Sequence, residues 1–188
     1  MSRIPPASPP YPASVQTQLD ALTLPGQTPL YLFRVLARDE RLFTRALGAG
    51  LLDRGHLSVR QRELVILRVC ANNRSEYEWG VHVSIFARKA GFTPEQVEAT
   101  SNASASAGCW SASEQLLLRL CDALFESTEL SDALWAELAR EFSPEAVLEL
   151  LLLSSFYRTI SVLTNGLRMP LEDFAARFPP ALPSVSCD

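Results

Sequence analysis

The sequence has little of what a nucleic-acid-binding or membrane-associated protein needs. Its 17 lysines and arginines are outnumbered by 21 acidic residues, which gives a formal net charge of -4, and the basic residues are scattered along the chain. Nucleic acid and anionic lipid both require a concentrated positive surface. We therefore expect neither a nucleic acid nor a membrane as a partner.

Long apolar runs are also missing. The longest candidate, residues 146–153, contains Glu149 and is far shorter than the about 18 residues that cross a bilayer. The N-terminus is rich in proline and serine and lacks the apolar core of a secretory signal. These absences predict a soluble, cytoplasmic protein.

Cysteine is sparse, and its spacing indicates no thiol chemistry. The four cysteines are Cys70, Cys109, Cys121 and Cys187, and no two of them form a C-x-x-C pair. Cys70 and Cys121 fall inside apolar helical patterns, where a free thiol usually packs as a small hydrophobic side chain. We interpret the cysteines mainly as structural thiols. A glycine-rich loop that would hold phosphate is also missing.

No alternating apolar run indicates a strand, whereas helix-start signals are frequent. A Ser or Thr is followed three positions later by Glu or Gln, the capping-box spacing, at Ser58–Gln61, Ser75–Glu78, Thr93–Gln96 and Ser111–Glu114. Pro94 and Pro144 each suit a first helical position. Together with the apolar spacing, these signals predict helices at about 29–37, 39–51, 58–72, 75–90, 93–101, 111–126, 131–142 and 144–165. The predicted fold class is all-α.

The chain is expected to form one helical domain between two flexible ends. Its 188 residues and 47% hydrophobic composition suit a single core. Residues 1–27 are interpreted as an extended or flexible arm, 28–178 as the helical domain and 179–188 as a flexible tail. The helix at 144–165 is apolar on nearly every side, so it is either central or covered by another subunit.

The candidate chemistry lies on two successive helices. Ser75, Glu78 and His82 recur at helical intervals and line one stripe. Glu63 lies on the preceding helix, and an antiparallel hairpin would bring it to His82. A carboxylate beside an imidazole and an apolar wall is typical of proton transfer. We expect Glu63 to act as a general base with a raised pKa.

The other candidate residues support that pair. His82 would donate a proton or orient a carboxylate, and Glu78 completes the predicted catalytic set. Ser75 and Glu78 would hold substrate or water, while Tyr77 and Trp79 would form walls. Cys70 is added to the predicted substrate-binding residues because it follows Glu63 on the same helix face.

Structural interpretations of the same residues stay open. Ser75 and Glu78 could be only a capping box, Glu63 could be an ion-paired surface acid, and His82 could be a core histidine. The Glu-x-x-His pairs of di-iron bundles are missing, so we expect no metal and no cofactor. His56 is interpreted as a loop residue.

Several separated motifs resemble the carboxymuconolactone decarboxylase family, which includes the alkylhydroperoxidase D-like proteins. They are the run 57–68, Glu76-Tyr77-Glu78-Trp79 with His82, and the run 90–95; the resemblance extends from about Leu30 to Glu172. It implies an alkylhydroperoxidase D-like helical fold built around a helical hairpin. It also implies assembly into trimers or hexamers.

The peroxidase branch of that family carries a Glu followed one helix later by C-x-x-C-x-x-x-H. Here the Glu corresponds to Glu63 and the His to His82, but the two cysteine positions hold Ser75 and Glu78. A disulfide cannot form there, so a peroxidase would have to use Cys70.

The remaining acid and base groups favour the lyase branch of the family. The resemblance then implies decarboxylation or isomerisation of a small carboxylated lactone or a related ring-cleavage product. The alternatives are peroxidase-type antioxidant activity and a non-catalytic oligomeric ligand-binding scaffold.

Overall fold

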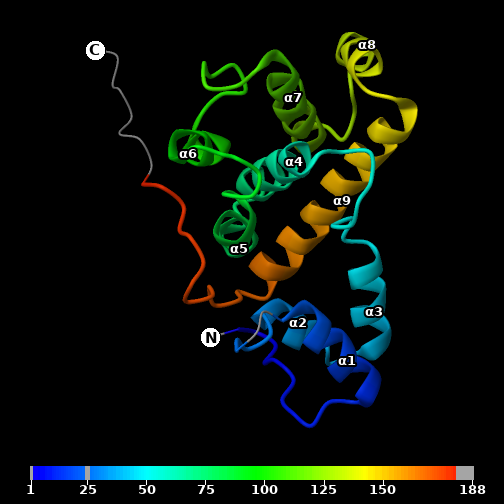
Figure 1. Cartoon of the computed structure of the whole chain (residues 1–188), viewed down its shortest axis with the longest axis vertical. Helices are drawn as coiled ribbons and strands as arrows, with labels where there is room; N and C mark the ends of the chain where they lie inside the picture. Colours follow the sequence, from blue (N-terminus) through cyan, green and yellow to red (C-terminus); the bar gives the residue numbers. More distant parts are fainter. Residues whose placement is uncertain (1, 24–25, 181–188) are drawn as a thin grey trace.

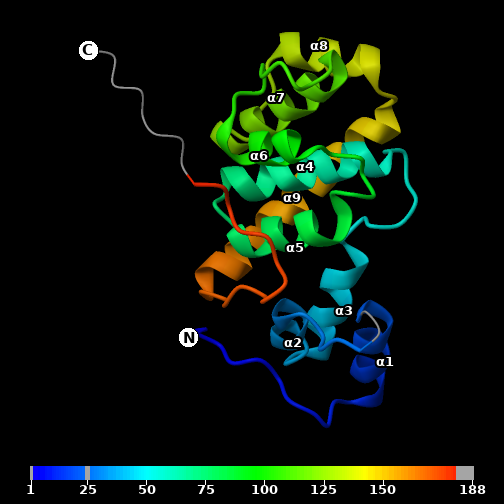
Figure 2. The ribbon, with the colours of Figure 1, turned by 60° about the vertical axis from the view of Figure 1, so that its left-hand side comes forward.

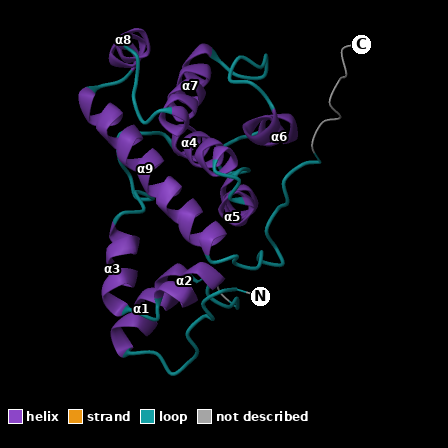
Figure 3. Ribbon diagram, turned by 180° about the vertical axis from the view of Figure 1, so that it is seen from behind, coloured by secondary structure: helices purple, strands orange, loops and turns teal. Residues whose placement is uncertain are grey.

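The computed structural model describes residues 2–23 and 26–180 (Figure 1). Over these residues the secondary structure is helical without strands, which confirms the all-α class (Figure 3). The helices are α1 (Ala13–Leu22), α2 (Tyr31–Leu36), α3 (Glu40–Gly48), α4 (Val59–Asn72), α5 (Glu76–Phe86), α6 (Pro94–Asn102), α7 (Ala112–Glu126), α8 (Asp132–Glu141) and α9 (Pro144–Gly166). The predicted tail at 179–188 lies largely outside the described residues.

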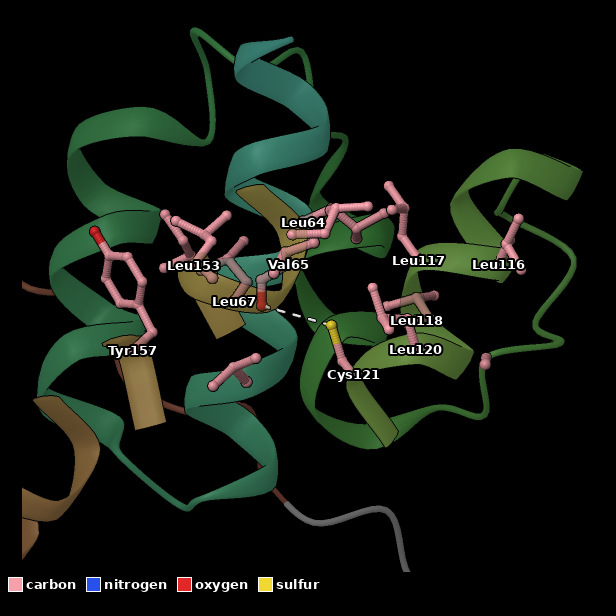
Figure 4. Close-up of a cluster of buried hydrophobic side chains, with 14 of the residues drawn as sticks. Leu64, Val65, Leu67, Leu116, Leu117, Leu118, Leu120, Cys121, Leu153 and Tyr157 are labelled. Atoms are coloured by element: carbon pink, nitrogen blue, oxygen red, sulfur yellow. Dashed lines mark hydrogen bonds between the residues drawn. The ribbon is translucent and has the colours of Figure 1, made fainter. Parts of the chain in front are cut away.

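Helix α4 is the centre of the fold and packs against α5, α6, α7 and α9. Its apolar side chains Leu64 to Leu67 are almost completely buried. Leucines from α7 and Leu153 from α9 meet them in one cluster, which Figure 4 shows in close-up. The helix is therefore enclosed on nearly all sides, so its polar residues need partners inside the protein.

Side-chain caps fix the starts of several helices as the sequence predicts. Ser58, Thr93 and Ser111 each form a complete capping box with the Gln or Glu three positions later. Pro94 and Pro144 occupy the first turn of α6 and α9. The box predicted at Ser75 is wrong, because Ser75 makes no capping hydrogen bond.

The N-terminal residues contain a helix where an extended arm was predicted. Val15 and Leu19 of α1 are fully buried against Phe43 of α3 and Ala37. Their spacing of four residues places both on one face, and burying that face stabilises the short helix. Helices α1–α3 thus form a small second layer beside the core (Figure 2).

Helix α9 contributes one face to the core. By length and composition alone it could cross a membrane, but it packs against α4, α5 and α8. The side chains of Leu148, Leu152 and Val162 are more than half exposed on its outer face. One face of α9 is thus packed into the core, and the opposite face is exposed.

The segment after α9 runs back along α5 as a strap, which we define as residues 172–178 (Figure 2). The Ala176 amide donates to the Gly80 carbonyl at 3.2 Å and to Ser84 Oγ at 2.9 Å. The ring of Phe178 lies 4.9 Å from that of Trp79. The strap therefore covers the outer side of the helix that carries Glu78 and His82.

Candidate acid/base site

The hairpin of α4 and α5 brings Glu63 and His82 into direct contact. A tight turn joins the helices, with the Ser75 amide donating to the Cys70 carbonyl at 2.8 Å and Arg74 in the left-handed region at φ 54°. Glu63 Oε2 lies 2.7 Å from His82 Nδ1. Only 1% of Glu63 and 4% of His82 are exposed, so the interpretation of Glu63 as a surface acid is wrong.

Arg62 holds the other oxygen of Glu63. Its Nε and Nη2 each donate to Glu63 Oε1 at 3.1 Å, and its Nη1 donates to the Leu52 carbonyl at 2.8 Å. Arg62 itself is 7% exposed. A buried guanidinium that donates from all three nitrogens orients the carboxylate rigidly and balances its charge. Both oxygens of Glu63 are therefore engaged.

Glu78 approaches the imidazole from the opposite side. Its Oε1 lies 3.4 Å from His82 Nε2, at ion-pair distance. Its Oε2 is buried and has no hydrogen-bond partner among the described residues. A buried carboxylate oxygen without a partner is costly, so it calls for an explanation, and a catalytic role is one such explanation. The chain Arg62–Glu63–His82–Glu78 therefore ends in an available acceptor.

The two carboxylates favour the charged form of His82. Burial by itself would lower the pKa of His82, but the hydrogen bonds and charges of Glu63 and then Glu78 outweigh it and raise the pKa to about 9. A neutral imidazole could donate from one nitrogen only, whereas both nitrogens of His82 face carboxylate oxygens. The imidazolium satisfies both contacts. Two basic side chains, Arg62 and His82, thus face two acidic ones, Glu63 and Glu78.

Ser75 and Cys70 lie beneath this cluster and not at an accessible surface. Ser75 Oγ is 2.9 Å from Thr164 Oγ1 on α9, which explains why it does not cap α5. Cys70 is fully buried. Burial, followed by the charge of Glu78, raises the pKa of the Cys70 thiol well above its usual value. A reactive thiol requires the opposite on both counts.

Tyr77 and Trp79 point to other parts of the molecule, so the contacts do not support their prediction as substrate walls. The Tyr77 hydroxyl accepts from the Leu32 amide at 3.0 Å and donates to Glu172. The Trp79 indole donates to Thr100 Oγ1 at 2.9 Å. On a helix, residues adjacent to Glu78 necessarily leave its face. These hydrogen bonds give both side chains structural roles.

Tyr157 of α9 belongs to the site, although sequence reasoning missed it. Its ring lies edge-on to the His82 imidazole, with centroids 5.1 Å apart at 88°. It is 75 positions from His82, and no motif links the two. Only its place within the apolar pattern of residues 144–165 could have indicated that it faces the core.

Two further observations concern metal binding and the position of a surface groove. Within the described ranges, no group of three or more His, Cys, Asp and Glu side chains is arranged to hold a metal ion. A surface groove of about 390 Å³ opens elsewhere, between α7 and α9, where it is lined by Phe125, Arg158 and Val162 among others. The groove is not lined by Glu63, Glu78 or His82.

The fold is that of the alkylhydroperoxidase D-like proteins. An uncharacterised peroxidase-related protein from Silicibacter sp. TM1040 is 16% identical with a TM-score of 0.81, over 95% of this chain and 96% of that one. An alkylhydroperoxidase AhpD core protein from Ralstonia eutropha JMP134 is 17% identical with a TM-score of 0.81, over 92% and 93%. The debrominase Bmp8, in complex with 2,3,4-tribromopyrrole, is 15% identical with a TM-score of 0.73, over 93% and 94%. At these identities the likeness shows the fold.

The segment that holds the site is similar in sequence to a known protein family. Residues 40–120 match the carboxymuconolactone decarboxylase family, and this segment contains Glu63, Glu78 and His82. The match confirms the resemblance seen in the motifs. No curated protein matches the chain.

Proposed function

We propose that the protein is an acid/base enzyme that decarboxylates or isomerises a small carboxylated lactone or a related ring-cleavage product. The observation that carries this proposal is the unpartnered Oε2 of Glu78 at the end of a buried chain of charged groups. The family that residues 40–120 match is named after such a lyase. A catalytic acid or base needs an oxygen that no other group of the protein occupies, and Glu78 Oε2 meets that requirement.

The geometry changes the roles that the sequence suggested. Glu63 cannot be the reacting base while Arg62 and His82 occupy its two oxygens. In the proposed mechanism Glu63 orients His82, and His82 in turn holds Glu78 Oε1, much as the members of a catalytic triad orient one another. Glu78, at the position of a cysteine in the peroxidase branch, then exchanges protons with the substrate.

The proposed steps balance with a proton from solvent water and no other co-reactant. In decarboxylation, the bond to the carboxylate breaks, carbon dioxide leaves, and the electron pair remains as an enolate of the lactone carbonyl. A proton from the Glu78–His82 pair then adds to carbon, and solvent water returns a proton to the pair. In isomerisation, Glu78 Oε2 removes a proton from carbon and returns it to another carbon of the same enolate.

Turnover of small carboxylated lactones by the purified protein tests the proposal. We expect Glu78→Gln and His82→Ala to reduce kcat by about 100-fold or more, the range for a lost acid or base group. Glu63→Gln should lower kcat less, because it misorients His82 without removing the reacting oxygen. Glu137→Gln, on the surface in an ion pair with Arg119, is the control and should retain activity.

The alternatives give different results in the same assay. Peroxide reduction that is lost in Cys70→Ser would replace the proposal with thiol chemistry. Full lactone turnover by both Glu78→Gln and His82→Ala would rule out the assigned roles. Absence of turnover in the wild type, with peroxide as well as lactones, would favour the non-catalytic scaffold.

A further inference from the structure

The groove between α7 and α9 reaches from the surface to the core. Its volume of about 390 Å³ lies within the range of small-ligand pockets, about 300 to 1,000 Å³. Three of its lining side chains, Val69, Cys121 and Ser154, are almost completely buried, one each from α4, α7 and α9. Leu124 and Phe125 of α7 add apolar surface to the lining. The groove is therefore deep enough to remove part of a small molecule from water.

One positive charge lies at this groove. Among the described residues that line it, Arg158 of α9 carries the single charged side chain, and the others are apolar or neutral. Arg158 Nη1 donates to the Leu124 carbonyl at 3.2 Å, and the guanidinium lies 5.9 Å from the centroid of the Phe125 ring. The hydrogen bond places a cation near the end of α7, where it is favourable, but it uses one nitrogen only. A positive charge without an acidic neighbour in the groove favours an anionic ligand.

Two arginines of α4 show how a guanidinium held in this way binds a carboxylate. Arg68 donates from Nη1 to backbone carbonyls, and from Nε and Nη2 to the two oxygens of Asp122 at 2.7 and 2.8 Å. Arg62 likewise uses Nη1 for a carbonyl, and Nε and Nη2 for Glu63. In Arg158 the bond from Nη1 to a carbonyl is present, but Nε and Nη2 make no hydrogen bond to the described residues. The edge that can bind a carboxylate with two donors is therefore available.

We propose that the groove binds a small monocarboxylate with an apolar body. The carboxylate accepts hydrogen bonds from Arg158 Nε and Nη2, and the apolar body lies against Leu124 and Phe125. One carboxylate is expected, because a second would meet no further cation in the groove. Glu78 and His82 do not line the groove, so this site is separate from the acid/base cluster and does not depend on the proposed function.

Calorimetric titration of the full chain with octanoate tests the proposal, with 1-octanol as a matched probe that lacks the carboxylate. We expect octanoate to bind more tightly than octanol. Arg158→Gln should weaken octanoate binding by about 5- to 10-fold, the effect of losing a partly exposed pair with two hydrogen bonds, and leave the octanol Kd unchanged. Arg45→Gln, on α3 outside the groove, removes the same charge and is the control. NMR shift changes on binding should centre on Thr128 and Thr159, which line the groove.

Each outcome decides for or against the groove as a carboxylate site. Equal octanoate Kd values in wild type and Arg158→Gln, or an octanol Kd in wild type as low as that of octanoate, would overturn it. Shift changes centred on His82 would place the carboxylate in the acid/base cluster instead. A wild type that binds neither probe overturns the proposal as well, and a mass in light scattering that then falls with Val162→Glu would assign the groove to a second copy of the chain. Octanoate binding that Arg158→Gln selectively weakens supports the proposal, whether or not lactones are turned over.

Discussion

At the scale of single residues, the site depends on how two carboxylates share one imidazole. Glu63 is fixed by Arg62 and presents one oxygen to His82, whereas Glu78 keeps one oxygen without a partner. In the proposed mechanism the same residue type therefore serves two purposes, orientation at Glu63 and reaction at Glu78, according to the partners that the fold supplies. Environments that separate two acids in this way are typical of enzymes that transfer protons.

The charge on His82 should make the stability of the protein depend on pH. The folded-state pKa is raised from 6.5 to about 9, so the contribution of the imidazolium is complete below pH 6.5 and is lost as the pH rises through 9. At about 1.4 kcal/mol per pKa unit, the loss is about 3 kcal/mol. Urea unfolding of wild type and His82→Gln across this range measures it. A difference between the two proteins that stays constant from pH 6 to 10 would contradict the assignment.

The sequence was sufficient to predict the contact of Glu63 with His82 but not the rest of the cluster. Two adjacent helices with a tight turn must form a hairpin, so residues on facing stripes meet. Arg62 could not be placed in the same way, because a long side chain next to Glu63 could equally reach solvent. Tyr157 lies on a helix distant in sequence, where only tertiary packing decides the neighbour.

At the scale of elements, helix α5 has two faces with different tasks. Glu78 and His82 point into the core, while Gly80 and Ser84 face the strap. The backbone of the strap approaches so closely that a Cβ on Gly80 would collide with the carbonyl oxygen of Ala176. The glycine is thus required by the approach of a second backbone and not by its own dihedral angles.

Gly80→Ala should therefore destabilise the protein, although alanine is the better helix former. The collision involves backbone atoms, so relief requires displacement of the strap, at a cost of about 1–3 kcal/mol for an overpacked site. Gly48→Ala is a matched control, since a Cβ there meets no atom within 4 Å. Thermal unfolding of both variants gives the comparison. A Tm for Gly80→Ala at or above that of Gly48→Ala would show that the strap moves freely.

Helix boundaries were predicted best where a side chain provides the cap. The helices starting after Ser58, Thr93 and Ser111 begin where their capping boxes place them. Helix α1 was missed because the proline-rich start of the chain dominates its composition. Ser75 was misread because its hydroxyl could bond either the helix start or a distant partner, and Thr164 is the partner in the fold.

At the scale of the whole molecule, the outer face of α9 exposes apolar side chains that no other part of the domain covers. Leu148, Leu152 and Val162 recur on one side of the helix and remain more than half exposed. The groove of about 390 Å³ continues this face toward Phe125. Apolar surface of this extent in a soluble protein commonly marks a contact with another chain. We propose that a second copy of the chain covers it.

Light scattering after gel filtration tests this assembly. We expect the wild type to have a mass of at least twice 20.8 kDa. Leu152→Glu should shift the mass toward that of a single chain, because the new charge would be buried in the contact. Leu42→Glu, at another exposed leucine, should leave the mass unchanged. A wild-type mass of one chain would contradict the proposed assembly.

The guanidinium of Arg62 links the proton chemistry to the segment between α3 and α4. It bonds the carbonyls of Leu52 and Asp53 while it holds Glu63. A displacement of Glu63 would therefore reach this linker through its hydrogen bonds with Arg62. We therefore expect a ligand bound beside Glu63 to change the rate of amide hydrogen exchange in residues 50–57, at the surface of the protein.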